Sequence, residues 1–510
     1  MLRLMKHSLV FLLFALSSVF AQADKYHELA LEGIAQGHNL QINKAEAIFN
    51  EMIALDPNHP LGYLAQALTN LYGHQFEENQ KTFEKKFTDY TETAIKLARK
   101  NLSSQPRPVE ALFHLGVAYV FLGFYHGERS NWLRALWYGK QGIDYLEHVI
   151  ASDTSYYDAY LGLGAYHYYA DPRRLKFFVK NGAALLGYKG DRKKGLRELQ
   201  LAAEKGVYAR PEALFLLGFI YFGENDYEKA LRYFEALAQQ YPDNPFFALA
   251  LVGTLQNTGN YSRAVEIANR VVAQKSDNRN LAFHMQSYYC LGKLYFDLNQ
   301  FETAVANYTK ALATAVQVSG KTKGLVASAN FNLGHSYEML GKREEAIPYY
   351  RQIKESDDKY AYQNAKKHLE QPHLPVEEKI IRGENYFKTK NYDQALEVFE
   401  AAYAKALENT DDYPSREISG LLFNIGNAQY EKKNYAEAIA VFTKILALKN
   451  IEEKWIEPRA HFNLGNCHRE MGDKQKAEVE YETAYKYDDD WLRLEIDKAR
   501  EKDGSKFLKN

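Results

Sequence analysis

Apolar residues recur every three or four positions in two consecutive runs between residues 211 and 242, and a short polar turn separates the runs. This spacing places each run on one face of a helix and predicts a helix–turn–helix unit. Gly218 and Ala230 are small, which suits a close crossing of the two helices. Asp226 can cap the second helix, and Pro242 can end it. The apolar positions are Leu217, Gly218, Tyr221, Ala230, Phe234 and Leu237.

The same unit returns through the C-terminal half of the chain. In most units a glycine on the first helix is followed twelve residues later by an alanine on the second helix. This order and spacing resemble the tetratricopeptide repeat, whose period is ~34 residues. The resemblance implies an all-α fold, a right-handed α-solenoid of helix-turn-helix repeats. The glycines are Gly218, Gly292, Gly334, Gly383, Gly426 and Gly465.

The repeat pattern also suggests how the chain is organised. Residues 22–208 are expected to hold degenerate N-terminal helical repeats. Residues 211–490 are expected to hold the regular repeats, with a break near 371–375 where two prolines lie close together. Residues 491–510 are expected to form a polar capping helix and tail, because the open end of a solenoid needs a polar cover.

Residues 156–206 depart most from a plain repeat, because an apolar and basic stretch at 175–197 delays the second helix. The order of segments there is similar to that of the inclusion-body clearance tetratricopeptide proteins and their uncharacterised bacterial relatives. The apolar face of the stretch can lie in a membrane interface or pack on a neighbouring repeat. Small residues within it favour packing. The face comprises Leu175, Phe178, Val179, Gly182 and Leu186.

The first 21 residues have the pattern of a cleaved secretory signal peptide, with a basic start, an apolar run and small residues before Gln22. No cysteine follows the run, so a lipoprotein anchor is not expected. The mature protein is therefore expected outside the cytoplasm, in the periplasm. No later stretch of ~18 unbroken apolar residues occurs in the chain.

Composition narrows the function further. The formal net charge is -1, so no global field favours nucleic acid, and no nucleic-acid partner is expected. The 39 Tyr and 28 Phe are explained by repeat packing more simply than by an aromatic-binding role. The two cysteines, Cys290 and Cys467, lie in distant repeats and are expected to remain free thiols.

Catalytic and metal signatures are missing from the sequence. The 15 histidines show no metal-ligand spacing, no cysteine cluster can hold zinc, and no Gly-x-Ser-x-Gly elbow occurs. Residues 187–194 resemble a phosphate loop only faintly, because the glycine spacing and the Lys-Ser/Thr end are absent. We therefore expect no enzyme activity, no cofactor and no metal site.

The binding surface is expected on the first helices. In the repeats that this chain resembles, these helices line a concave groove, and their ninth position often carries an asparagine that can bond a bound peptide's backbone. That asparagine is also common in repeats that bind nothing. The groove candidates are Lys293, Phe296, His335, Glu338, Glu384, Phe387, Asn427, Tyr430, Asn466 and Arg469.

Taken together, these patterns favour an exported scaffold that binds a peptide segment or a partner protein in its groove. Two other hypotheses stay open. One is a membrane-surface adaptor that uses the basic apolar stretch, and the other is a cell-wall or carbohydrate-binding protein. The sequence names neither the partner nor the oligomeric state.

Overall fold

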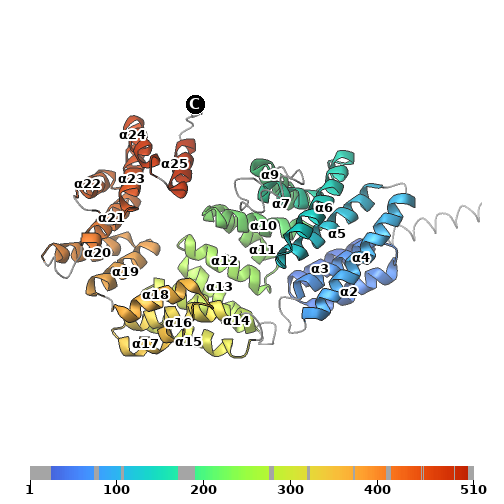
Figure 1. The fold of residues 1–510 in the computed structure, drawn as a ribbon, viewed down its shortest axis with the longest axis horizontal. Helices are drawn as coiled ribbons and strands as arrows, with labels where there is room; N and C mark the ends of the chain where they lie inside the picture. The colour runs from blue at the N-terminus through green and yellow to red at the C-terminus, as the bar shows by residue number, and fades with distance from the viewer. Residues whose placement is uncertain are drawn as a thin grey trace, which may run out of the picture. The chain divides into compact units, whose positions relative to one another are not determined.

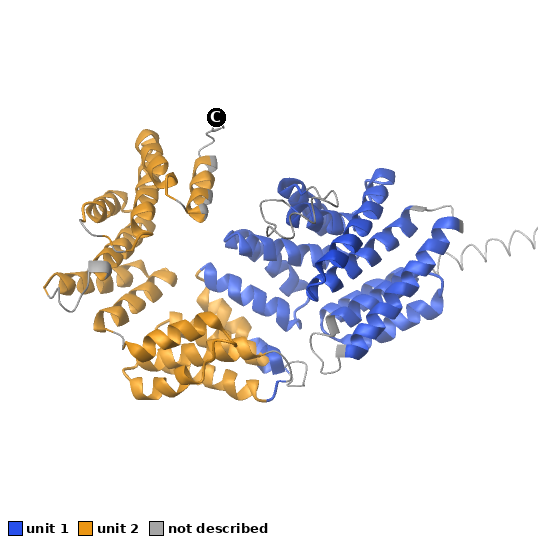
Figure 2. Ribbon diagram, viewed as in Figure 1, with its two compact units in different colours: residues 1–258, 270–283, 317–321 blue, residues 259–269, 284–316, 322–510 orange. Residues whose placement is uncertain are grey.

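The computed structural model is all-α over the part of the chain it describes, which confirms the expected class (Figure 1). Two compact units are present: residues 1–258, 270–283 and 317–321 form unit 1, and residues 259–269, 284–316 and 322–510 form unit 2 (Figure 2). The structure describes residues 25–73, 80–104, 108–170, 190–274, 281–318, 322–371, 374–408, 415–448, 451, 453–487 and 489–502.

Unit 1 begins with a helix over residues 25–38 and continues as helices that each pack against the next along the chain. The most extensive helix contact is that of α5 with α6. The bounds are α2 (Ile42–Leu55), α3 (Pro60–Gly73), α4 (Gln80–Ser104), α5 (Pro108–Glu128), α6 (Trp132–Ser152), α7 (Ala159–Tyr169), α9 (Arg192–Lys205), α10 (Arg210–Gly223), α11 (Tyr227–Gln240) and α12 (Pro245–Asn257).

Unit 2 holds most of α13 and the helices that follow it. The bounds are α13 (Tyr261–Ala273), α14 (Leu281–Asp297), α15 (Phe301–Ala315), α16 (Lys323–Glu338), α17 (Arg343–Arg351), α18 (Lys359–Glu370), α19 (Pro375–Lys388), α20 (Tyr392–Glu408), α21 (Ser415–Glu431), α22 (Tyr435–Leu446), α23 (Ile456–Glu470), α24 (Lys474–Tyr485) and α25 (Asp490–Lys502). The last helix, α25, packs on α23 and α24.

The repeat glycines let an aromatic ring of the second helix lie against the first helix. A Cβ added at Gly218 would come within 2.8 Å of the Phe234 ring, and one at Gly383 within 2.4 Å of Phe399. Both rings are almost fully buried. Only a hydrogen leaves room for the ring at this distance. This explains why an aromatic residue follows both glycines at the same step, at 234 after 218 and at 399 after 383.

The turn between paired helices has the expected cap. The Asp226 carboxylate accepts a hydrogen bond from the Lys229 backbone N–H at 3.3 Å at the start of α11. The residue before it, Asn225, has φ 59°. Asparagine tolerates this left-handed conformation better than most residues. The same position is occupied by glycine in the turns at Gly341 and Gly472.

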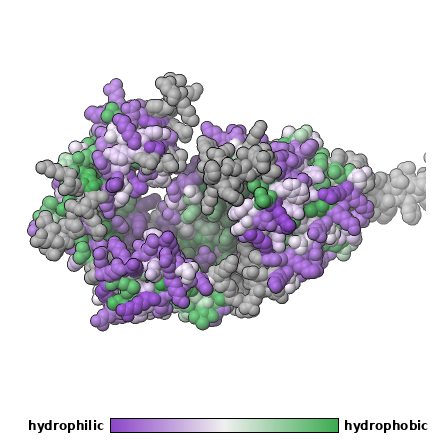
Figure 3. All heavy atoms as spheres, in the orientation of Figure 1, coloured by the Kyte–Doolittle hydropathy of each residue, from purple (hydrophilic) through white to green (hydrophobic). Residues whose placement is uncertain are grey.

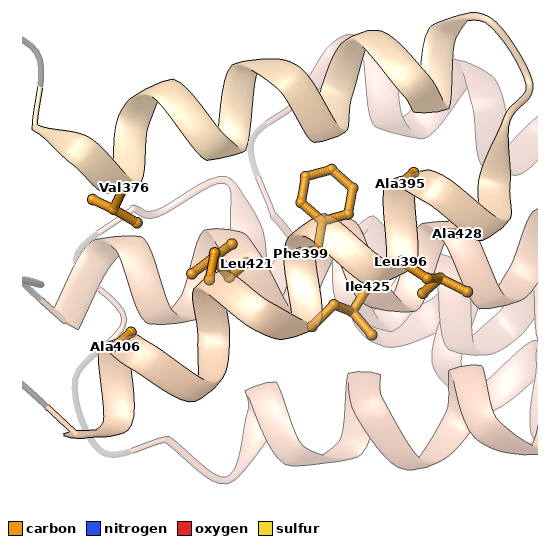
Figure 4. Packing of buried hydrophobic residues seen from close by; sticks show 9 residues of the cluster. Val376, Ala395, Leu396, Phe399, Ala406, Leu421, Ile425 and Ala428 are labelled. Carbon is orange, nitrogen blue, oxygen red and sulfur yellow. The ribbon is translucent and has the colours of Figure 1, made fainter.

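The cores form where three successive helices meet. Around α20, side chains from α19, α20 and α21 pack together (Figure 4). The members of this cluster are Val376, Ala395, Leu396, Phe399, Ala402, Ala406, Leu421, Ile425 and Ala428. Each repeat therefore completes its core with the first helix of the next repeat, as the repeat pattern predicts.

Helix α18 was not expected from the sequence. It follows α17 as an additional helix, is capped by Asp358 through the Ala361 N–H at 3.0 Å, and buries Ala361 and Ala365. It packs on both α16 and α17. Its small buried residues lack the glycine–alanine–aromatic order of the repeat, so the pattern did not reveal it.

Unit 1 contains contacts between segments about two hundred residues apart in sequence. The His38 ring lies 3.2 Å from the Glu212 carboxylate, and His27 Nδ1 lies 2.7 Å from the Tyr208 hydroxyl. The Asn244 side chain also donates a hydrogen bond to the His38 carbonyl. The helix at 25–38 therefore packs against the segment that leads into α10 and α12, which the nearest-neighbour rule for repeats does not predict.

Helix α5 is long and apolar enough to cross a membrane by length and composition alone. It packs against α3, α4, α6 and α7, with Leu115, Ala118 and Tyr119 buried in helix contacts. A core helix passes the same test as a spanning helix, so this result assigns no membrane topology.

Candidate functional site

The ten predicted groove residues lie on first helices of unit 2, namely α14, α16, α19, α21 and α23. Lys293 is exposed, Glu338 is buried, and the remaining eight side chains are partly buried. We call α19, α21 and α23 the first-helix row, because consecutive members of this set contact each other. The partly buried residues are Phe296, His335, Glu384, Phe387, Asn427, Tyr430, Asn466 and Arg469.

Side-chain hydrogen bonds join the helices of the first-helix row in one register. Asn463 on α23 donates from Nδ2 to Oδ1 of Asn427 on α21 at 2.7 Å. One repeat earlier, Asn424 on α21 bonds the carboxylate of Glu384 on α19. In both cases a ninth-position side chain meets an asparagine of the next first helix. These bonds fix the spacing of the row and hold its polar side chains in place.

The last ninth-position residue, Asn466, has a different partner. The Tyr481 hydroxyl of α24 donates to Asn466 Oδ1 at 2.8 Å. Both Asn427 and Asn466 thus use their amide oxygen as an acceptor within the fold. Neither amide nitrogen donates a hydrogen bond to any residue that the structure describes. Two neighbouring helices therefore present amide donors that a bound chain could use.

Glu338 belongs to a buried polar cluster that joins three helices. Its carboxylate lies 2.5 Å from Arg343 Nη1 and 2.6 Å from His368 Nδ1, and it accepts from the Tyr350 hydroxyl at 2.8 Å. Its side chain is 3% exposed. The cluster fastens α18 onto α16 and α17, so in this structure Glu338 serves packing and is not presented to a ligand.

Each aromatic candidate takes part in a ring contact. Phe296 lies 4.9 Å from the His335 ring, Phe387 lies 5.4 Å from Tyr392, and Tyr430 lies 5.6 Å from Tyr435. Burial raises the pKa of Tyr430 to about 12, so its hydroxyl stays protonated at neutral pH. Tyr430 can therefore act as a hydrogen-bond donor one turn from Asn427.

Charged candidates of both signs occur on these helices. Arg469 pairs with Glu470 at 2.7 Å, and Lys293 is exposed on α14. Burial raises the pKa of Glu384, while Lys388 and the hydrogen bond from Asn424 oppose that rise. The mixture fits a ligand without a strong net charge better than a strongly charged one.

Within the described residues, no group of three His, Cys, Asp or Glu side chains could hold a metal ion. Cys290 and Cys467 are both free thiols, as expected, and burial raises the pKa of each, to about 11 and about 12. The 175–197 stretch lies outside the described residues up to position 189. The predicted signal peptide at 1–21 also lies outside them.

Family models described as tetratricopeptide repeat match five overlapping segments of the sequence. Together the matches run from 183 to 359 and from 382 to 490. No curated protein matches the chain. The resemblance of residues 156–206 to the inclusion-body clearance proteins stays a prediction. The matched segments are 183–245, 221–284, 283–359, 382–450 and 417–490.

Several solved structures are similar. A tetratricopeptide repeat protein from Parabacteroides merdae is 13% identical, with 56% of this chain and 97% of that chain covered and a TM-score of 0.24. The Cut9–Hcn1 hetero-tetramer of the APC/C is 14% identical, with coverages of 90% and 93% and a TM-score of 0.28. NprR in complex with its cognate peptide NprX is 14% identical, with coverages of 58% and 85% and a TM-score of 0.25.

Proposed function

The chain belongs to the tetratricopeptide repeat superfamily, and from that premise we propose that it is an exported scaffold that binds a partner protein through the first-helix row. Repeats of this kind generally bind protein or peptide partners, and the fold is typically non-catalytic. The finer part of the proposal is the place of binding, on α19, α21 and α23, and the form of the ligand, an extended peptide segment.

The observation that supports this place is the pair of amide donors on Asn427 and Asn466. Each side chain is held by a hydrogen bond to its oxygen, from Asn463 and from Tyr481. Each nitrogen makes no bond within the described residues. A peptide backbone offers carbonyl oxygens at regular spacing, so it can satisfy both donors at once. Side chains that are already held lose little entropy on binding.

Export is a separate part of the proposal and rests on the pattern of residues 1–21. We infer that the partner is an extracytoplasmic protein. Fractionation of cells that express the full chain tests this part alone. A chain that starts at Gln22 in the periplasmic fraction supports export, and an uncleaved chain in the cytoplasm contradicts it.

The binding test compares two variants with two matched controls. A partner is isolated from an extracytoplasmic extract, and its affinity for the purified chain is measured by calorimetry. Asn427→Ala and Asn466→Ala each remove an amide donor and should each weaken binding by about 0.5–1.5 kcal/mol. Asn463→Ala breaks the same internal bond as Asn427→Ala but keeps the Asn427 donor. Tyr481→Phe likewise breaks the internal bond of Asn466 but keeps the Asn466 donor.

The controls separate contact from structure. If the amides touch the ligand, the two asparagine variants lose affinity while Asn463→Ala and Tyr481→Phe keep most of it. Equal losses in variants and controls would mean that only the internal hydrogen bonds matter. Unchanged affinity in the Asn427→Ala, Asn466→Ala double variant would place the binding surface elsewhere.

A further inference from the structure

Glu384 is the acidic member of the ninth positions in the first-helix row. It lies on α19, and the same position holds Asn427 on α21 and Asn466 on α23. Hydrophilic side chains cover most of the described surface that is visible in Figure 3, so a charged side chain at the surface is ordinary in this chain. Glu384 differs from such side chains because it is partly buried. A carboxylate that has lost part of its water is stabilised by a charged or hydrogen-bonded partner.

Within the part of the chain that the structure describes, the Glu384 carboxylate belongs to no ion pair. The positive charge that acts on it is that of Lys388, one turn along α19, but the Lys388 amino group lies 3.4 Å from Asp297 Oδ1. Glu417 on α21 adds a second negative charge, and Asn424 supplies a hydrogen bond without a charge. Burial raises the pKa of Glu384 against these two favourable contacts. The negative charge of Glu384 is therefore only partly compensated within the described fold.

A chain of polar side chains connects Glu384 to the two asparagine donors. Asn424, which bonds Glu384, lies one turn before Asn427 on α21. Asn463, which bonds Asn427 at 2.7 Å, lies one turn before Asn466 on α23. The three ninth-position side chains are thus held in one register across the first-helix row. The row presents an acceptor on α19 and amide donors on α21 and α23.

We propose that Glu384 selects peptides with a lysine or arginine side chain at one position of the segment that binds along the first-helix row. This inference rests on the proposed function and names the class of its ligand. A basic side chain supplies the positive charge that Glu384 lacks, and its N–H groups can bond the carboxylate. The charges on these helices are mixed, so one basic residue in an otherwise neutral segment fits them.

The spacing of the row fixes the place of that basic residue in the peptide. Helices in contact lie about 8–10 Å apart, and an extended peptide advances about 3.3 Å per residue. The basic residue should therefore stand about three residues from the one whose carbonyl accepts from Asn427. A fixed position distinguishes selection by Glu384 from a general attraction of positive charge, which would leave the basic residue at any position.

Selection from a phage-displayed library of random peptides tests the inference without the natural partner. The purified parent chain, Glu384→Gln and Glu397→Gln serve as bait under the same conditions. Glu384→Gln removes the charge but keeps an oxygen acceptor in a side chain of the same shape. Glu397 is the control, because it is exposed on the second helix α20. The parent and Glu397→Gln should enrich peptides with Lys or Arg at one position, and Glu384→Gln should lose that preference.

A peptide that the parent enriches then gives a quantitative test by calorimetry. Glu384→Gln should bind this peptide at least about tenfold more weakly than the parent does. Replacing the basic residue of the peptide by glutamine should weaken binding to the parent by a similar factor. The two changes together should weaken binding no more than either change alone, because they remove the same contact. The circular dichroism spectrum of each variant should match that of the parent.

The outcomes separate this inference from the proposed function. Suppose that the enriched peptides depend on Asn427 and Asn466 but have no preferred basic position, or that Glu384→Gln keeps the preference of the parent. Glu384 then does not select the ligand, while the proposed function stands. If the parent enriches no peptide, or only peptides that bind the Asn427→Ala, Asn466→Ala double variant equally well, the proposed function fails and this inference fails with it.

Discussion

Gly218 shows how a single residue type sets the geometry of a repeat. Its missing side chain leaves room for the Phe234 ring, 2.8 Å from where a Cβ would stand. A Cβ added at Gly253 on α12 would meet no other atom within 4 Å. The two glycines look alike in the sequence, yet only one of them is in a helix crossing. The glycine–alanine step distinguishes the two glycines, because Gly253 lies one position out of register with Ala264.

The first prediction therefore pairs these two positions. Gly218→Leu should destabilise unit 1 by roughly 1–3 kcal/mol, because the buried Phe234 ring must move. Gly253→Leu should be neutral or stabilising by up to about 0.8 kcal/mol, because leucine favours a helix more than glycine does. Urea unfolding followed by circular dichroism measures both. Equal effects at the two sites would contradict the packing account.

His114 provides a prediction on pH. The ring is buried on α5, and burial, with a smaller effect of His59, lowers its pKa from 6.5 to about 3. The folded state keeps His114 neutral, whereas the unfolded state binds a proton below pH 6.5. This contribution to stability is therefore complete above pH 6.5 and is lost as the pH falls toward 3.

Replacing His114 should remove that loss. Between pH 7 and 5 the parent should lose about 2 kcal/mol more unfolding free energy than His114→Gln does. The exposed His148 gives a control, and His148→Gln should keep the pH dependence of the parent. Urea midpoints at the two pH values supply the comparison. Parallel pH profiles for His114→Gln and the parent would show that this ring does not set acid sensitivity.

At the scale of elements, α18 shows what the repeat pattern leaves out. The helix is fastened by Glu338, whose carboxylate contacts both Arg343 and His368. From sequence alone Glu338 was one groove candidate among ten, because its position on α16 matched the expected groove face. Glu338 is buried because α18 packs over it. The buried residues of α18 are small and do not follow the repeat pattern, so the sequence did not reveal this helix.

The cluster around Glu338 should contribute measurably to the free energy of unfolding. Glu338→Gln leaves Arg343 without its buried counter-ion and should cost on the order of 2–4 kcal/mol. Glu370 on α18 pairs with Lys366 at 3.8 Å with both side chains exposed, so Glu370→Gln should cost at most about 1 kcal/mol. Urea unfolding compares the two substitutions. A loss for Glu338→Gln no larger than that for Glu370→Gln would mean that the cluster does not hold α18.

Across the whole molecule, the sequence predicted what is local and repeated. It predicted the all-α class and the helix pairs, because both follow from spacing within about 34 residues. It could not predict the contact of His38 with Glu212. That contact depends on the sum of many small rotations between successive repeats. For the same reason it placed the candidates on first helices without showing that Asn463 and Tyr481 hold Asn427 and Asn466.

Site-specific photo-crosslinking tests the central claim, that a partner binds along α19, α21 and α23, most directly. A photoreactive phenylalanine replaces Tyr430 on α21, one turn from Asn427, and in a control replaces Tyr360, which is 76% exposed on α18. After illumination in an extracytoplasmic extract, the Tyr430 position should form one dominant adduct, and excess unlabelled chain should compete it away. The Tyr360 position should not form that adduct. An adduct from Tyr360 alone, or the same adducts from both positions, would contradict binding by the first-helix row.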